Sequence, residues 1–345
     1  MEKPIKSYSL LEFQDLIKDL NQPLFRAKQL SEWIYQRNAS SYEDMTNLPK
    51  SLRENLLEFH PLYQPSILDS QTSSDGTQKF ILGYHDGVCV ETVSIPSKDG
   101  RLTVCCSSQV GCGMACSFCA TGKEGFNRNL SIGEIVDQII IVQNETKRRV
   151  SNVVVMGQGE PFLNYDNTLE ALRILNHPKL FNIGARHITL STCGIVSGIE
   201  KLSYEPEQFT LAISLHTAVQ QIRDIIMPGV SKYPLKRLKT ALMSYVEVTN
   251  RRVSLEYALI QNINDQKSDL EALTEFCHGL LCHINLIPLN KVNDSPCQPS
   301  SLKTMNSWLS SLNNSGIETT VRNSRGTDIA GACGQLKNAF NNKIE

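Results

Sequence analysis

Apolar side chains recur at helical spacing in the N-terminal part of the chain. Residues three or four positions apart lie on one face of a helix, and this spacing is kept by Leu10, Phe13, Ile17 and Leu20, and again by Phe25, Leu30, Trp33 and Ile34. Pro49 is suited to the start of a further short helix. The polar stretch Ser70 to Thr77 then indicates a linker. We therefore predict an N-terminal helical accessory domain over residues 1–75.

From Lys79 onward the apolar runs become shorter and suit β-strands. Residues 80–84 and 88–95 flank the turn-forming sequence His85-Asp86-Gly87, which predicts a β-hairpin extension over residues 76–104. Later runs alternate with helical stretches, at residues 102–105, 153–156, 188–190, 211–215, 253–259 and 284–287. This alternation is typical of an α/β fold with a parallel sheet. We predict a partial (β/α)6 barrel over residues 105–322 and a C-terminal loop over residues 323–345.

One helix of this barrel has a well-marked start. Ser131 and Glu134 have the spacing of a capping box, and apolar residues follow at helical spacing. A helix is therefore predicted to begin at Ile132. In such barrels the loops after the C-terminal ends of the strands form the active face.

The composition of the chain limits the kinds of nucleic-acid surface, cellular location and cysteine chemistry that we expect. The chain has 34 Lys and Arg against 35 Asp and Glu, so a nucleic-acid surface would have to be local. The N-terminus shows no apolar signal region, and no run reaches the roughly twenty apolar residues of a membrane span. We expect a cytoplasmic protein without a membrane segment. Eleven cysteines in a reducing compartment are then candidate metal ligands or catalysts.

Three cysteines lie within eight residues of one another after the first predicted barrel strand, at Cys112, Cys116 and Cys119. A structural zinc site would need a fourth protein ligand and usually a second Cys-x-x-Cys pair, which the sequence lacks. A [4Fe–4S] cluster held by three cysteines leaves one iron free, and S-adenosylmethionine (SAM) can bind there through its amino and carboxylate groups. The spacing resembles that of the radical SAM superfamily. Three unconnected buried cysteines are the alternative.

Polar groups follow several later strands and are candidates for holding SAM. Gly159 and Glu160 follow the second strand, where glycine lets the backbone approach a ligand and a carboxylate accepts an amino group. Further candidates at later strand ends are Ser191, Ser214, Leu215, His216 and Asn290. Each taken singly is more often a capping or otherwise satisfied polar residue.

Four ordered motifs together resemble one family, the RlmN-type dual-specificity RNA methyltransferases. They lie at residues 90–93, 105–112, 125–130 and 332–336, and the resemblance extends from Arg26 to Leu336. It implies a partial radical SAM barrel with a helical accessory domain of RNA-binding type. It also implies methylation of C2 of adenine 2503 in 23S rRNA and of adenine 37 in some tRNAs, with a flavodoxin or ferredoxin as electron donor.

The resemblance assigns roles to three further residues. Cys333 takes a methyl group from one SAM and becomes S-methylcysteine. A second SAM supplies the radical that removes hydrogen from this methyl group, so two SAM are used per turnover. Cys105 then forms a transient disulfide with Cys333, and Glu91 accepts the C2 proton. Sequence pattern alone does not choose between Cys105 and Cys106.

Local cations are the expected contacts to RNA. We expect Arg322 and Arg325, which precede Cys333, to follow the phosphate backbone near the target base. Other candidates are Arg26, Lys28, Arg53, Lys147, Arg148, Arg149, Arg251 and Arg252. Two rival functions remain: methylation of adenine at C8 by the related group, and an RNA-binding protein with a purely structural metal site.

Overall fold

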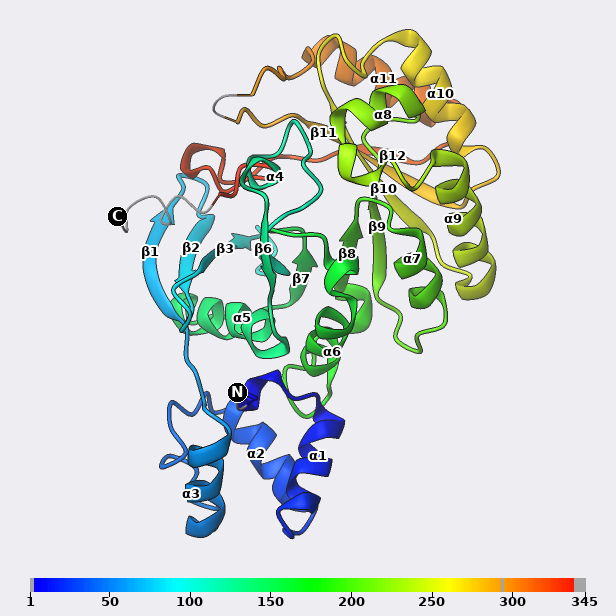
Figure 1. Cartoon of the computed structure of the whole chain (residues 1–345). Coiled ribbons are helices and arrows are strands. Elements are labelled where there is room, and N and C mark those ends of the chain that lie inside the picture. The colour runs from blue at the N-terminus through cyan, green and yellow to red at the C-terminus, as the bar shows by residue number, and fades with distance from the viewer. Residues whose placement is uncertain (1–2, 293–294, 338–345) are drawn as a thin grey trace.

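The computed structural model describes residues 3–292 and 295–337 and contains a helical N-terminal part beside a large sheet (Figure 1). The N-terminal helices are α1 (Leu10–Asp19), α2 (Phe25–Tyr35) and α3 (Lys50–Phe59). Their apolar faces are buried, with Phe13, Ile17 and Leu30 at 1 % exposure or less. The predicted amphipathic helices are therefore confirmed, and α3 begins directly after Pro49.

Within the described residues, ten strands form one open sheet in the order β1-β2-β3-β4-β7-β8-β9-β10-β11-β12. Their bounds are β1 Ser66–Thr72, β2 Gln78–Gly83, β3 Cys89–Pro96, β4 Leu102–Cys105, β7 Asn152–Val155, β8 Ile188–Thr192, β9 Thr210–Ser214, β10 Val253–Leu259, β11 Cys282–Pro288 and β12 Thr319–Val321. The first four strands pair antiparallel, and all pairs from β4 to β12 are parallel. The six predicted barrel strands are all present as neighbours.

Two strands of this sheet lie where the sequence pattern gave no sign of them. Strand β1 occupies part of the predicted linker Ser70 to Thr77 and extends the hairpin by one strand. Six of its seven residues are exposed, so the strand carries no alternation of apolar and polar residues. Strand β12 has only three residues. The domain boundaries remain predictions, and residues 338–345 of the predicted C-terminal loop lie outside the described residues.

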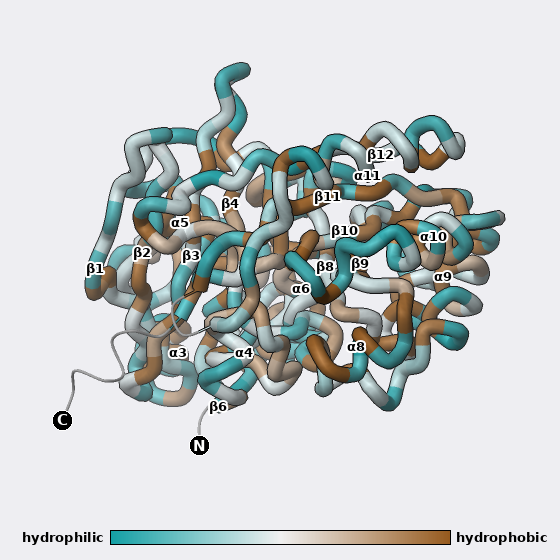
Figure 2. The backbone as a smooth tube through the Cα atoms, turned by 90° about the horizontal axis from the view of Figure 1, so that it is seen from above, coloured by the Kyte–Doolittle hydropathy of each residue, from teal (hydrophilic) through white to brown (hydrophobic). Residues whose placement is uncertain are grey.

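Helices join the parallel strands and cover the outer side of the sheet (Figure 1). They are α5 Ile132–Thr146, α6 Tyr165–Asn176, α7 Val196–Ser203, α8 Gln220–Ile226, α9 Leu235–Thr249, α10 Lys267–Cys277 and α11 Leu302–Asn314. Apolar segments recur along strands and helices and alternate with polar loops (Figure 2). Within the described residues, no helix is long and apolar enough to cross a membrane.

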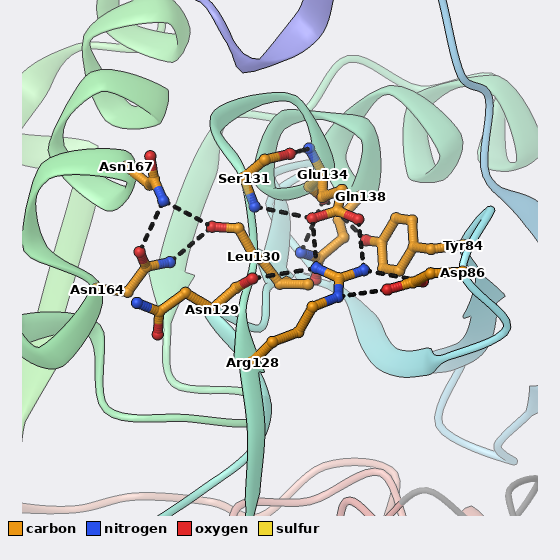
Figure 3. A network of polar contacts seen from close by, with 10 residues as sticks. All are labelled: Tyr84, Asp86, Arg128, Asn129, Leu130, Ser131, Glu134, Gln138, Asn164 and Asn167. Atoms are coloured by element: carbon orange, nitrogen blue, oxygen red, sulfur yellow. Dashed lines mark hydrogen bonds and ion pairs between the residues drawn. The ribbon is translucent and has the colours of Figure 1, made fainter. Parts of the chain in front are cut away.

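Helix α5 begins as predicted and anchors a polar network (Figure 3). The Ser131 backbone N–H donates to Glu134 Oε2 at 2.8 Å, which completes the capping box. Arg128 on β6 (Phe126–Asn129) donates to Glu134 at 2.8 Å and to Asp86 at 2.6 Å. Because β6 follows the three-cysteine loop, this network fixes that part of the chain to α5 and to the β2–β3 turn.

The N-terminal part is joined to the barrel by a buried ion pair. Lys6 Nζ lies 2.7 Å from Asp137 Oδ1 on α5, and both side chains are almost fully buried. Gly133 makes this approach possible, because a Cβ there would lie 2.2 Å from Lys6 Cβ. The helical part thus packs against the helix that follows the cysteine loop.

Candidate active site

A cavity of about 160 Å³ opens at the C-terminal ends of strands β7 to β11. Ten of the thirteen predicted site residues line it: Cys112, Cys116, Cys119, Gly159, Glu160, Ser191, Ser214, His216, Asn290 and Cys333. Glu91, Cys105 and Leu215 are not part of this lining. The loops after successive parallel strands meet at one edge of a barrel, which explains how residues so far apart in sequence come together.

The three-cysteine loop lies between β5 (Gln109–Gly111) and α4 (Ala120–Glu124). Two backbone hydrogen bonds hold it on the segment after α8: Ser117 N–H donates to the Ile226 carbonyl at 3.0 Å, and Gly229 N–H donates to the Met114 carbonyl at 3.1 Å. Gly229 is required here, because a Cβ would lie 2.6 Å from Met114 Cα. The loop shape is therefore set by main-chain contacts.

The thiols of this loop suit a [4Fe–4S] cluster. Burial raises the pKa of Cys112 to about 12 and raises that of Cys116 as well, so their thiolates need a positive group nearby. Among the described residues no three His, Cys, Asp or Glu side chains converge on a single ion position. In an iron–sulfur cluster each thiolate binds a different iron. The cysteine ligands therefore need to line the same cavity, and they do not need to converge on the position of a single ion. The three thiols meet that requirement.

Glu160 is held rigidly at the cavity wall. Its Oε2 accepts the Cys193 N–H at 2.7 Å and its Oε1 accepts the Phe162 N–H at 2.9 Å. Burial raises the pKa of this carboxyl. Gly159 has φ +99°, and a Cβ there would lie 2.6 Å from Gln109 Cβ. The pair of residues thus offers a fixed carboxylate beside a half-buried glycine backbone that lines the cavity.

The remaining predicted SAM contacts offer different chemical groups to the cavity, namely hydroxyl groups and an imidazole. Ser191 Oγ and Ser214 Oγ lie 3.4 Å apart on neighbouring strands. His216 Nδ1 accepts the Ala258 N–H at 3.0 Å, and burial together with the charge of Arg223 lowers its pKa to about 3, so the imidazole is neutral.

Leu215 does not reach the cavity with its side chain, which is fully buried in the core. Its neighbours Ser214 and His216 line the cavity. Side chains alternate between the two faces at a strand end, and Leu215 therefore points into the apolar layer. Only its main chain remains available for the predicted contact.

A second cavity of about 180 Å³ adjoins the first. Cys105 lines this second cavity, while Cys333, Asn290 and Arg322 line both. Cys333 therefore lies at the boundary between the three-cysteine loop and Cys105. Burial raises the pKa of Cys105, a nearby charge on Cys333 raises it further, and Arg322 opposes both effects. Cys106 is fully buried in the core, so the structure separates two thiols that the sequence pattern does not distinguish.

Glu91 lies on β3 with 1 % of its surface exposed and lines neither cavity. Its carboxylate is 3.3 Å from Lys79 Nζ and accepts the Lys337 N–H at 3.0 Å. Burial raises the pKa of Glu91 to about 7, although Lys79 opposes this shift. The C-terminal segment thus covers the predicted proton acceptor.

The loop that carries Cys333 is fastened at both ends. At its start, Ser73 Oγ donates to Asp328 at 2.6 Å, and Gly326 N–H donates to Asp75 at 3.1 Å. We call these four residues the hairpin latch. At its end, the Gly334 carbonyl accepts the Ala120 N–H at 2.7 Å. The same α4 segment also holds the Leu336 carbonyl through Thr121 Oγ1 at 2.7 Å.

Arg322 is partly buried, with 29% of its side chain exposed, and pairs with an acidic residue. Its Nη1 lies 3.7 Å from Glu256 Oε2, and the charge of Cys333 is the largest cause of its raised pKa. Glu256 on β10 is 4 % exposed, and Asn285 Nδ2 donates to its Oε1 at 2.8 Å. Glu256 lines the first cavity and is not among the predicted site residues, although an acidic residue inside an apolar strand run is a usable signal.

Several other cations expected at RNA make contacts with neighbouring loops at the surface. Arg325 pairs with Asp75 at 3.9 Å. Arg149 donates to the Asn182 carbonyl at 2.9 Å, and Arg252 pairs with Glu318. These contacts tie loops together and leave the predicted RNA contacts of these side chains as predictions.

Two family models match the chain. The model of the radical SAM superfamily matches residues 106–276, and that of the ribosomal RNA large subunit methyltransferase N-terminal domain matches residues 5–60. Among curated proteins, a "Probable dual-specificity RNA methyltransferase RlmN" of Clostridium novyi (strain NT) is 43% identical over 98% of both chains. Another protein of this name, from Geobacillus kaustophilus (strain HTA426), is 44% identical over 96% of this chain and 92% of its own.

A solved structure shows the same fold. The crystal structure of a radical SAM methyltransferase from Sphaerobacter thermophilus superimposes with a TM-score of 0.91 and 41% sequence identity. The match covers 97% of this chain and 99% of the other. The similarity therefore includes the helical N-terminal part, the sheet and the segment that carries Cys333.

Proposed function

The chain belongs to the RlmN family of radical SAM RNA methyltransferases, and from this premise we propose that it methylates C2 of adenine in RNA through an S-methylcysteine at Cys333. The observation that carries the proposal is the position of Cys333 between the cavity of the three-cysteine loop and the cavity of Cys105. A methyl carrier must meet a methyl donor on one side and a resolving thiol on the other.

The cavity residues would hold two bound groups. Cys112, Cys116 and Cys119 would hold a [4Fe–4S] cluster, and the six SAM candidates of the lining are Gly159, Glu160, Ser191, Ser214, His216 and Asn290. When bound, the cluster and SAM supply a one-electron cleavage that yields a hydrogen-abstracting radical. Two SAM are used per turnover, because methyl donation and hydrogen abstraction require separate molecules.

The protein's own residues perform the remaining steps. Cys333 attacks the methyl donor as a thiolate, which is the nucleophilic form of cysteine. After the carbon joins C2, Cys105 attacks the Cys333 sulfur, so that one S–S bond forms and one C–S bond breaks. The released carbon keeps the C–S electron pair and takes a proton to become the methyl group, and the remaining unpaired electron returns to the one-electron carrier that supplied it. Glu91 accepts the C2 proton, since a pKa of about 7 suits a base at neutral pH. The Lys337 N–H must leave Glu91 for this step.

The names of the relatives support a proposal for the RNA substrates. The curated relatives are named dual-specificity RNA methyltransferases, and we propose adenine 2503 of 23S rRNA and adenine 37 of some tRNAs as the targets. A flavodoxin or ferredoxin is the proposed electron donor, because the cleavage consumes one electron from a low-potential source.

The test is anaerobic reconstitution with iron and sulfide, followed by dithionite, methyl-labelled SAM and protein-free 23S rRNA. Mass spectrometry of the digested nucleosides is expected to show labelled 2-methyladenosine together with 5′-deoxyadenosine. Cys333→Ala is expected to abolish the methylated base, whereas Cys282→Ala, at a thiol outside both cavities, is expected to retain it. Formation of 8-methyladenosine instead would favour the C8 alternative. An intact cluster that yields neither product would favour the structural-metal alternative.

A further inference from the structure

Arg223 is a cation with no solvent contact, on the short helix α8. Its side chain is 0% exposed and is the largest fully buried side chain of the described residues. Its guanidinium donates only to main-chain oxygens, those of Cys193 and, at 3.4 Å, Tyr233. Its Nε has no hydrogen-bond partner, and within the described residues the guanidinium forms no ion pair with a carboxylate.

Such an arrangement is unfavourable by itself. A guanidinium stays charged inside proteins, and a buried charge without a counter-charge is among the most destabilising features a core can have. Burial lowers the pKa of Arg223, which shows the same penalty. A buried arginine in this position indicates that an anionic group lies close by when the protein has bound its cofactors.

The contacts of α8 show where that anion would lie. The Ile226 carbonyl, one helical turn after Arg223, accepts the Ser117 N–H of the three-cysteine loop at 3.0 Å. On the other side, Gly194 makes room for the guanidinium, because a Cβ there would lie 3.1 Å from Nη2. Charges on Cys116, Cys193 and Asp224 oppose the lowering of the pKa of Arg223 by burial. In turn, the charge of Arg223 opposes the raising of the pKa of Cys116 by burial and adds to the lowering of the pKa of His216. Three of these four groups belong to the cavity wall.

We propose that the counter-charge of Arg223 is the iron–sulfur cluster on Cys112, Cys116 and Cys119, and that Arg223 is a positioning residue that stabilises the bound cluster and raises its reduction potential. Three thiolates around a doubly positive cluster leave one net negative charge, and reduction adds another. A fixed cation nearby favours the more negative state, so the potential rises. The inference rests on the cluster assignment made above, and it does not depend on the RNA target.

The test compares Arg223→Met with the wild-type protein, both without iron and after anaerobic reconstitution. Without iron, Arg223→Met is expected to be at least as resistant to urea as wild type, because an uncompensated charge is removed. With the cluster bound, the order is expected to reverse. Release of iron to a chelator is expected to be about ten-fold faster or more, the scale of outer-shell effects on metal affinity, and the reduction potential is expected to fall.

Two further variants separate charge from packing. Arg223→Lys retains the charge and is expected to keep most of the wild-type potential. Arg223→Gln, which can still donate to the carbonyls, is expected to lower the potential as the Met variant does, and it serves if the Met variant does not fold. Arg251→Met is the matched control: this partly buried arginine donates to the Phe209 carbonyl and lines neither cavity. Its effect on stability is expected to be equal with and without iron.

Several results would overturn the inference. Equal destabilisation of Arg223→Met with and without iron, at an unchanged potential, would show a purely structural role. Equal potentials in the Lys and Gln variants would show that charge is not what matters. A wild-type protein that retains no iron on the three cysteines would remove the premise itself. A protein that retains iron and shows the reversal but makes no methyladenosine would leave the inference standing and overturn only the RNA function.

Discussion

The two walls of the active site are built in opposite ways. The wall around Cys112 to Cys119 is local: eight consecutive residues supply the thiols, and main-chain contacts to Ile226 and Gly229 fix their shape. The wall around Cys333 is assembled from distant parts of the chain, with a latch from the β1–β2 turn, Cys105 from β4 and Arg322 after β12. The first wall therefore depends on backbone geometry and the second on long-range side-chain contacts.

This difference predicts different kinds of failure. Damage to the local wall is expected to remove the cluster and every later step. Damage to the assembled wall is expected to leave 5′-deoxyadenosine formation in place and to impair only transfer to RNA. The ratio of 5′-deoxyadenosine to methylated base is thus the measurement that separates the two walls.

The largest effect is expected for Cys116→Ser in the local wall. Loss of one thiolate leaves an iron without its protein ligand, so the reconstituted protein is expected to lose its visible absorption and to form no detectable 5′-deoxyadenosine. Iron content after gel filtration is the check. Cys277→Ser, at a buried cysteine outside the cavity, is the control. A fully loaded, active Cys116→Ser protein would contradict the assignment.

Gly159→Ala is expected to come next. The residue has φ +99° and its new Cβ would meet Gln109, so strain of about 1–3 kcal/mol and a displaced Glu160 are expected. Gly87→Ala is a matched control, because Gly87 has φ +83° with no atom within 4 Å of a Cβ. Calorimetric SAM affinity should fall in the first variant and hold in the second. An equal loss of SAM affinity in Gly159→Ala and Gly87→Ala would show that backbone strain, and not the contact with Gln109, causes the effect.

Glu91→Gln tests the assembled wall. The pKa of Glu91 is raised from 4.5 to about 7 in the folded protein. Protonation of Glu91 therefore contributes fully to the free energy of unfolding below pH 4.5, and this contribution is lost as the pH rises through about 7. Up to about 3 kcal/mol of stability changes over that range. Urea unfolding at several pH values should show this loss in wild type and a flatter profile in the variant. The variant is also expected to form 5′-deoxyadenosine without methylating RNA. If the free energies of unfolding of wild type and Glu91→Gln change in the same way with pH, a group other than Glu91 causes the change.

The smallest effect is expected for Asp75→Asn in the hairpin latch. Burial opposes ionisation of Asp75, but hydrogen bonds from Thr77 and Gly326 outweigh it and hold its pKa at about 2. The carboxylate is therefore charged at all working pH values, and the amide weakens a mostly exposed contact worth about 1 kcal/mol or less. Methylation is expected to slow a few-fold, with faster proteolysis near Gly326. Asp99→Asn, a carboxylate in another exposed turn, is the control and is expected to change neither.

The sequence predicted the local features best. The amphipathic helices, the capping box at Ser131 and the six parallel strands were all recognisable, because each depends on residues close together in the chain. Strand β1 was not recognisable, since it is polar and is held only by pairing with β2. The same division holds in the site. The three-cysteine motif predicts a metal site by spacing alone, whereas Cys105 and Cys333 were identified only through the family resemblance.

Contacts between distant residues explain the rest of what the sequence did not reveal. The phosphate contact of Arg322 stays a prediction, and the structure adds a partner that the sequence did not reveal, Glu256, on a strand far away in sequence. Arg223 gave no signal at all, because a buried arginine looks like a surface one until its surroundings are known. The charge balance of a core becomes visible only in three dimensions.

The hairpin latch has a consequence for reaction kinetics as well as for geometry. With the chain fastened at Gly326 and again at Leu336, the Cys333 thiol samples only the small volume that a short tethered segment can reach. Short tethers give effective concentrations in the millimolar range or above, so Cys105 meets its partner as an intramolecular reactant that soluble thiols cannot readily outcompete. The length of the tether would thereby protect the proposed transient disulfide from soluble thiols for as long as one methyl transfer takes.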